Sequence, residues 1–318
     1  MEAWVYGPER QEIRERVLAP GKLEEHVRDT FQAGLDSLQE LVATAESQAS
    51  IPPYRLKEHV YHMMDAISLC AHLSLPCEGK SRPQVTDRQL DLPESHRVHD
   101  RDVSSESPPF AVPNPTLLPD RFLKTLSPVF IIRHPAKAFP SYLRVCSAYG
   151  GSVFDDAFPI NASYRWQRLL YDCYDALYKG TDVKQGLALT NGHGAALSNG
   201  NGHVHRIWPI VLNGDDLIVR PEDVMQKLCH YAGLDPAHIC YTWDAEKPTS
   251  QDAISQALWN QVQCSTGIIK DPACSKPIVI SEEAKKWATE WDEAVAKKMI
   301  EFVEAAMEDY EYLLQFCI

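Results

Sequence analysis

Apolar residues along the chain alternate between helix-like and strand-like spacing, and the alternation predicts a mixed α/β protein. From residue 22 to residue 47 they recur every three or four positions, which is the spacing of one helix face, at Val27, Phe31, Leu35, Leu38 and Val42. Residues 127–133 (SPVFIIR) instead hold four consecutive apolar residues, typical of a short strand with both faces covered and both edges paired. Residues 207–217 (IWPIVLNGDDL) predict a second strand.

Prolines and capping residues predict where several helices begin. Pro135 begins a helix just after the first strand, and Pro221 begins one that ends at Gly233. Asn114 is expected to cap a short helix (NPTLLPDRFLKTL), and Ser281 a long amphipathic one with acidic residues in its first turn. Residues 162–179 predict an aromatic-rich helix, whose aromatic face either forms core or lines an acceptor pocket.

Strands that are separated by helices indicate an α/β layered protein with a mainly parallel sheet flanked by helices. We expect a single domain over residues 1–318. Residues 73–113 lack periodicity, and residues 181–206 are partly low in complexity, so both stretches are interpreted as loop insertions.

The charge balance excludes some classes of partner. The formal net charge of −13 does not favour nucleic acid or an anionic membrane, so an anionic ligand must be held by a local cluster of cations. No run of about eighteen apolar residues predicts a membrane span, and no basic-then-apolar leader begins the sequence. None of the nine cysteines forms a CxxC pair, and the histidines of residues 193–205 are too dispersed to predict a metal site. A cytoplasmic protein without a metal is expected.

Arg133 and Ser141 are the first candidates for ligand binding. Ligands of parallel α/β sheets lie beyond the carboxyl ends of strands, where an arginine can present a planar fork of donors to a phosphate. Ser141, two turns into the following helix, would add a hydroxyl to the same oxygens. Alternatively, Arg133 pairs with a carboxylate such as Asp215 or Asp216, and Ser141 is a solvated helix position.

Several segments together resemble the sulfotransferase branch of the P-loop superfamily. RHPAKAFPS (133–141) is similar to its 3′-phosphate signature, an Arg-x-Pro run with a serine eight residues after the arginine. KEH (57–59) resembles its Lys-x-His segment, and residues 215–235 resemble a later strand-end and helix segment. The nearest resemblance is to fungal sulfotransferase-like proteins, in which YGPERQ, KEH, NPTLLPDRF and IRHPAKAFPSY have close counterparts.

The resemblance implies a function and a set of roles. Arg133 and Ser141 would hold the 3′-phosphate of 3′-phosphoadenosine 5′-phosphosulfate (PAPS), and Lys270 in STGIIKD would lie in a loop over the nucleotide. His59 would be the catalytic base and Lys57 would stabilise charge on the transferred group. Alternatively, His59 is a structural histidine at a strand–helix junction. The implied reaction is sulfuryl transfer to a small-molecule hydroxyl in secondary metabolism.

One family element has no counterpart in this sequence. The family's first strand and its phosphate-cradling loop are lacking or replaced, since neither APGKLEE (19–25) nor CEGKSRP (77–83) has the required pattern. We therefore expect PAPS to bind weakly or not at all, and we expect an unpaired sheet edge that favours self-association. Two other hypotheses follow: a non-sulfating member that binds a small organic molecule in a biosynthetic pathway, and an interaction protein that uses the vacated sheet position.

Overall fold

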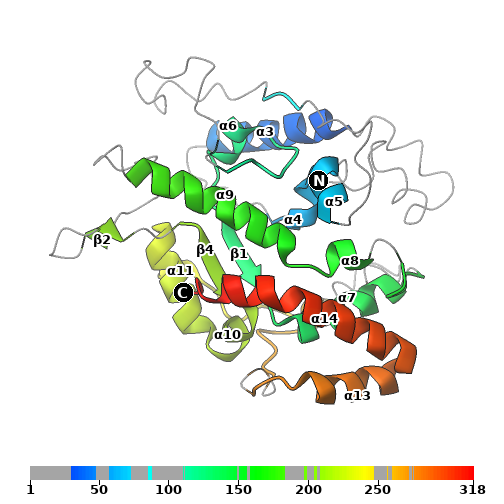
Figure 1. Ribbon diagram of the computed structural model, residues 1–318. Coiled ribbons are helices and arrows are strands. Elements are labelled where there is room, and N and C mark those ends of the chain that lie inside the picture. The colour runs from blue at the N-terminus through cyan, green and yellow to red at the C-terminus, as the bar shows by residue number, and fades with distance from the viewer. Residues whose placement is uncertain are drawn as a thin grey trace. The chain divides into compact units, whose positions relative to one another are not determined.

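The structure is a computed structural model of the 318-residue chain (Figure 1). The chain can be described over a discontinuous set of residues, and every structural statement below concerns these alone: 30–47, 57–72, 85–87, 110, 112–148, 150–155, 158–182, 197–198, 204–205, 208–246, 256, 260–271, 274 and 276–318.

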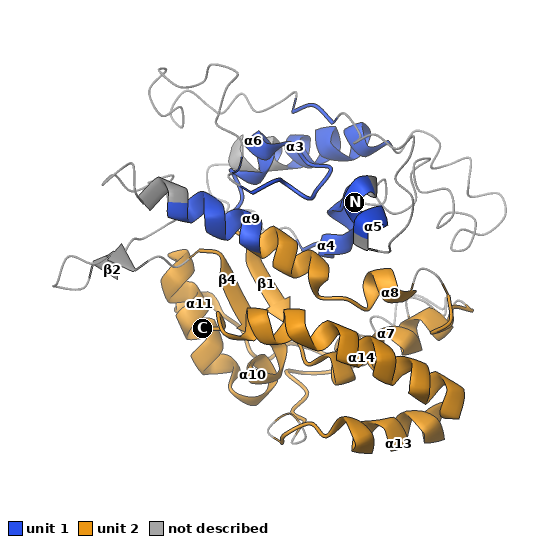
Figure 2. Ribbon diagram, in the orientation of Figure 1, with its two compact units in different colours: residues 1–127, 172–180 blue, residues 128–171, 181–318 orange. Residues whose placement is uncertain are grey.

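The chain divides into two compact units (Figure 2). Unit 1 comprises residues 1–127 and 172–180, and unit 2 comprises residues 128–171 and 181–318. Each unit is described by itself, and the expectation of a single domain stays a prediction.

Unit 2 is built on two parallel strands, as the sequence predicts. Strand β1 (Val129–Ile132) pairs with β4 (Ile210–Asn213), and the register runs from Val129 opposite Ile210 to Ile132 opposite Asn213. The C-terminal tail lies along the other edge of β4, where the Ile318 amide donates to the Val211 carbonyl. This small parallel pair is compatible with the expected α/β class.

The expectation that both faces of β1 are covered is wrong. Its side chains alternate between exposed and buried, and Ile131 is 59% exposed while its neighbours Phe130 and Ile132 are buried. A run of four apolar residues does not distinguish a strand covered on two faces from one covered on a single face. In the described part of the chain β1 pairs with β4 alone, so self-association through its other edge stays a prediction.

Helices of unit 2 pack against this pair. Helix α14 (Glu293–Leu314) contacts both strands and α7, the helix that follows β1. Its buried face repeats at helical spacing and is formed by Met299, Val303, Ala306, Tyr310 and Leu313. Helices and further strands of unit 2 are α7 (Pro135–Ser147), α8 (Phe158–Asn161), α9 (Arg165–Asp182, whose residues 172–180 belong to unit 1), β2 (Leu197–Ser198), β3 (Val204–His205), α10 (Gly214–Val219), α11 (Pro221–Ala232), η3 (Pro236–His238), α13 (Ile280–Glu290) and α14 (Glu293–Leu314).

Two predicted helix starts and one predicted helix end in unit 2 are confirmed. Helix α7 begins at Pro135 and α11 at Pro221, where a residue without an amide hydrogen costs no helical hydrogen bond. Helix α11 ends at Gly233, whose φ of 65° lies in the left-handed region that suits glycine.

The predicted cap at Ser281 is wrong. Helix α13 already begins at Ile280, after Val279 as N-cap, so Ser281 lies inside the first turn. Trp291 then leaves helical geometry, and Asp292 caps α14 by accepting a hydrogen bond from the Val295 amide at 2.8 Å. The predicted long helix is therefore followed at once by a second one.

Unit 1 contains four helices in its described part and the section of α9 noted above. They are α3 (Phe31–Ser47), α4 (Val60–Met63), α5 (Ala66–His72) and α6 (Asp120–Leu123). Helix α3 confirms the predicted helical spacing, although residues 22–29 lie outside the described residues. Residues 57–59 form no strand before α4.

The predicted helix start at Asn114 is wrong, because α6 begins at Asp120. Asn114 is buried and organises a turn instead: its side-chain oxygen accepts from the Thr116 amide, and its side-chain amide donates to the Leu118 carbonyl. The same turn pairs with the end of α4, where the Leu117 amide donates to the Met63 carbonyl at 2.8 Å. This pairing anchors the segment that carries the KEH residues.

The predicted insertions at 73–113 and 181–206 fall largely outside the described residues. No helix in the described ranges is long and apolar enough to cross a bilayer.

Candidate functional site

The carboxyl ends of β1 and β4 bring Arg133 and Asp215 together. Arg133 directly follows β1, and Asp215 lies two residues after Asn213, which ends β4. Because the strands are parallel, both residues emerge at the same edge of the pair. Gly214 allows this approach, since a Cβ atom on it would lie 3.2 Å from the Ile132 carbonyl oxygen.

Asp215 is a buried carboxylate between two cations. It is 8% exposed, and its Oδ1 lies 3.1 Å from Nε of Arg133 and 3.6 Å from Nζ of Lys137. The alternative that the sequence left open for Arg133, an ion pair with Asp215, is therefore what the structure contains. Within this cluster of three side chains, two cations share one carboxylate.

Tyr164 holds the backbone of Arg133. The Arg133 amide donates to the Tyr164 hydroxyl oxygen at 3.1 Å, and the hydroxyl donates to the Arg133 carbonyl. Burial raises the pKa of Tyr164 far above its usual range, although the hydrogen bond with Arg133 acts in the opposite direction. The hydroxyl therefore stays protonated and able to donate.

His134 begins helix α7 as its N-cap. Its Nδ1 accepts a hydrogen bond from the Ala136 amide at 3.1 Å, and its ring lies against Tyr310 of α14, with 5.3 Å between centroids. Desolvation lowers the pKa of His134, and the nearby Lys137 acts in the same direction although Asp215 opposes it. A neutral imidazole is the form that can accept this hydrogen bond.

The other phosphate-site residues expected from the sequence lie in unit 2 as well. Ser141 is exposed on α7, and Lys270 is exposed in the segment that precedes Cys274. The Cys274 thiol, which sequence reasoning missed, lies 3.9 Å from Nη2 of Arg133. Desolvation and the neighbouring Asp215 raise the pKa of Cys274, so it is a poor nucleophile. Arg133 thus contacts Asp215 and Cys274, and Asp215 also contacts Lys137, whereas no hydrogen bond or ion pair joins Arg133 to Ser141 or Lys270 among the described residues.

Lys57 and His59 form a pair in unit 1, as KEH implies. Nζ of Lys57 lies 3.0 Å from Nε2 of His59. An ammonium group has no acceptor, so Nε2 accepts this hydrogen bond and the ring proton lies on Nδ1. Glu58, between them, accepts from the His59 amide at 2.6 Å and contacts Nδ1 of His62 at 2.8 Å.

This environment favours the neutral form of His59. Desolvation, the charge of Lys57 and the neighbouring His62 lower the pKa of His59 to about 4, and Glu58 opposes them only in part. At neutral pH the exposed imidazole is therefore unprotonated and needs no prior deprotonation, but its low pKa makes it a weaker base than an ordinary histidine.

The aromatic helix forms core. Trp166 and Tyr171 are buried in unit 2, and Tyr174 is buried in unit 1. Trp166 also donates through its indole nitrogen to the Ile160 carbonyl at 2.6 Å. The core alternative therefore describes these three rings.

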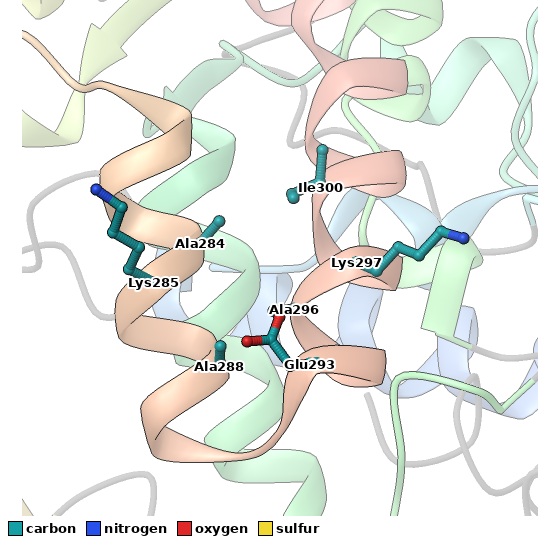
Figure 3. Close-up of a pocket in the computed structure, with 7 residues that line it drawn as sticks. All are labelled: Ala284, Lys285, Ala288, Glu293, Ala296, Lys297 and Ile300. Atoms are coloured by element: carbon teal, nitrogen blue, oxygen red, sulfur yellow. The ribbon is translucent and has the colours of Figure 1, made fainter.

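A small cavity of unit 2 lies away from these residues. It has a volume of about 180 Å³ and lies between α13 and α14, where Ala284, Ala288 and Ala296 leave space between Lys285 and Lys297 (Figure 3). Ligand pockets usually measure roughly 300–1,000 Å³, so this cavity is too small for a nucleotide. Within the described residues, no three His, Cys, Asp or Glu side chains gather as metal ligands.

Known proteins of similar sequence share a name. Sulfotransferase ppzF from Metarhizium majus is 31% identical over 312 residues, which cover 96% of this chain and 81% of the relative. The protein of the same name from Metarhizium rileyi is 34% identical over 209 residues, which cover 63% of this chain and 55% of the relative. The chain matches no protein-family model. It also matches no solved structure.

Proposed function

Because this chain belongs to the sulfotransferase-like family of the two Metarhizium proteins, we propose that it transfers a sulfuryl group from PAPS to a hydroxyl of a small organic molecule. The observation that carries the proposal is the extent of the similarity, which spans 96% of the chain. A role in secondary metabolism is part of the same proposal, and it rests on the resemblance alone.

Arg133 and Lys137 are proposed to hold the 3′-phosphate of the donor. The presence of two cations around the single carboxylate of Asp215 supports this, as does their place at the carboxyl ends of parallel strands. Nε of Arg133 is engaged by Asp215, so the phosphate would be bound by the terminal nitrogens of the guanidinium group. Ser141 and Lys270 are proposed as further ligands, on the resemblance to the family signature.

His59 is proposed as the catalytic base. Its Nε2 would take the proton of the acceptor hydroxyl while that oxygen bonds to sulfur and the bond from sulfur to the 5′-phosphate oxygen breaks. Lys57, which donates to the same nitrogen in this structure, would turn toward the leaving oxygen and neutralise its charge. The second product is 3′-phosphoadenosine 5′-phosphate (PAP).

A transfer assay tests the proposal. The purified protein is incubated with PAPS and a panel of phenols and aliphatic alcohols, and PAP is measured by chromatography. We expect PAP to form only when an acceptor is present. Failure to form PAP with any acceptor of the panel, at PAPS concentrations high enough for a weakly bound donor, would refute the proposal.

A non-sulfating member that binds a small organic molecule in a biosynthetic pathway is the second candidate. The observation that favours it is the ion pair between Arg133 and the buried Asp215, which competes with a phosphate for the guanidinium group. In this case acceptor-like molecules bind, but no PAP is released from PAPS.

The pH dependence of turnover provides a test of His59. A base must be unprotonated, and the protonated fraction of His59 rises only as the pH falls through its pKa of about 4. We therefore expect kcat/KM for the acceptor to stay constant from about pH 8 down to about pH 5 and to fall below that. An acid limb near the ordinary histidine pKa of about 6.5 would contradict the assignment.

Lys57→Gln is the matched variant for this profile. The ammonium group of Lys57 is one of the causes that lower the pKa of His59, so its replacement by an uncharged amide should move the acid limb to higher pH. Circular dichroism across the same pH range separates titration of the base from unfolding.

A further inference from the structure

The backbone of Arg133 lies just beyond the β1–β4 ladder and needs partners of its own. The register ends at Ile132 opposite Asn213, so the amide and carbonyl of Arg133 have no place in the strand pairing. Unpaired backbone groups at a half-buried position cost free energy comparable to a lost hydrogen bond. A single side chain, Tyr164, supplies both partners, as acceptor for the amide and donor to the carbonyl.

Tyr164 is itself firmly held. It is 5% exposed, its ring stacks on Phe139 of α7 with 6.0 Å between centroids, and Tyr310 of α14 lies at 5.8 Å on the same ring. Two helices of unit 2, α7 and α14, thus hold the ring that carries this hydroxyl group. A residue that is separated from Arg133 by 31 positions in the sequence determines where the arginine backbone leaves the sheet.

The side chain of Arg133 is constrained at its other end. Nε donates to Oδ1 of Asp215 at 3.1 Å, so the stem is fixed between Tyr164 at the backbone and Asp215 at the guanidinium group. A fixed stem limits where the terminal nitrogens can lie, and it removes the entropy cost of ordering a long side chain when an anion binds.

We propose that Tyr164 is a positioning residue that holds Arg133 in the orientation in which it binds an anionic phosphate group. The identity of that group as the 3′-phosphate of PAPS rests on the proposed function, but the positioning role does not. The chemistry recognised is a phosphate oxygen, from inorganic phosphate or from a nucleotide.

The test compares Tyr164→Phe with Tyr174→Phe. Both variants keep the ring and lose a buried hydroxyl that donates to a backbone carbonyl, since Tyr174 is 1% exposed and donates to Leu123 at 2.8 Å. Tyr164→Phe loses one more hydrogen bond, because the Arg133 amide also donates to that hydroxyl, and Arg133 is affected only in this variant. Arginine-detected NMR follows the Nε–H signal of Arg133 during titrations with inorganic phosphate and, separately, with PAP.

We expect phosphate to shift this signal at similar concentrations in the wild type and in Tyr174→Phe. In Tyr164→Phe the phosphate concentration at the midpoint of the shift should be roughly tenfold higher. Equal midpoints in all three proteins, or no shift in the wild type, would overturn the inference. A response to phosphate without a response to PAP would remove the nucleotide assignment and leave the positioning role intact. If Tyr164→Phe does not fold, Phe139→Leu replaces it as the test, because it removes one support of the Tyr164 ring but keeps the hydroxyl. This variant should also raise the midpoint, and an unchanged midpoint would refute the positioning role.

Discussion

Replacement of His59 by alanine is expected to lower turnover by roughly 10²–10⁴-fold while the affinity for PAP stays nearly unchanged. The physical reason is that a neutral imidazole with a pKa of about 4 is a proton acceptor at neutral pH, and alanine offers none. Turnover is measured as PAP release at saturating acceptor, and PAP affinity by calorimetry.

His62→Asn is the control for this substitution. His62 is the nearest neighbouring imidazole and contacts Glu58 through Nδ1, a contact that the asparagine amide can reproduce. It should reduce turnover far less than His59→Ala. Equal losses in the two variants would indicate damage to the segment rather than removal of a base, and unchanged turnover in His59→Ala would exclude His59 from the mechanism.

Arg133→Ala is expected to weaken PAP binding by roughly 10²-fold or more. Hydrogen bonds to charged groups contribute about 1.5–3 kcal/mol each, and a guanidinium group can form two with one phosphate. The loss should be specific to the 3′-phosphate, so the preference for PAP over adenosine 5′-phosphate should shrink by the same factor, and Lys137 should retain the remainder. Competitive NMR titrations measure both affinities, including weak ones.

Two further variants sharpen this result. Arg133→Lys keeps the charge but not the planar fork, so it should restore binding only in part. Asp215→Asn keeps an oxygen that can accept from Nε and fix the stem, but it removes the negative charge that competes for Arg133, so it should strengthen PAP binding. If Arg133→Ala binds PAP as the wild type does, or keeps its preference over adenosine 5′-phosphate, Arg133 is a structural ion-pair partner of Asp215 and not a phosphate ligand.

The sequence predicted most local features of unit 2 because their causes are local. Pro135 and Pro221 restrict φ at their own positions, and Gly233 provides the left-handed turn that ends α11. These effects act within a few residues, so one stretch of sequence is enough to predict them. The predicted caps at Asn114 and Ser281 failed because a polar side chain also serves in a turn or in a first helical turn, depending on its neighbours.

The candidate site was predicted only in part. KEH indicated Lys57 and His59 as candidates, and the structure places Nζ of Lys57 3.0 Å from Nε2 of His59, while their catalytic roles stay predictions. Tyr164 gave no signal of its own, since a tyrosine at the start of an aromatic-rich stretch is typical of core. Cys274 likewise carried no motif that would connect it to Arg133.

By itself, the sequence determined the α/β character, the two strands, the family and the identities of Arg133 and His59 as candidates. The tertiary structure decided what Arg133 contacts. Its partner Asp215 is 82 residues away, and they meet because β4 lies next to β1 in parallel. The tertiary structure also decided that one face of β1 is exposed. The physical reason is that backbone preferences depend on neighbouring residues, whereas an ion pair or a covered face depends on which distant segment packs there.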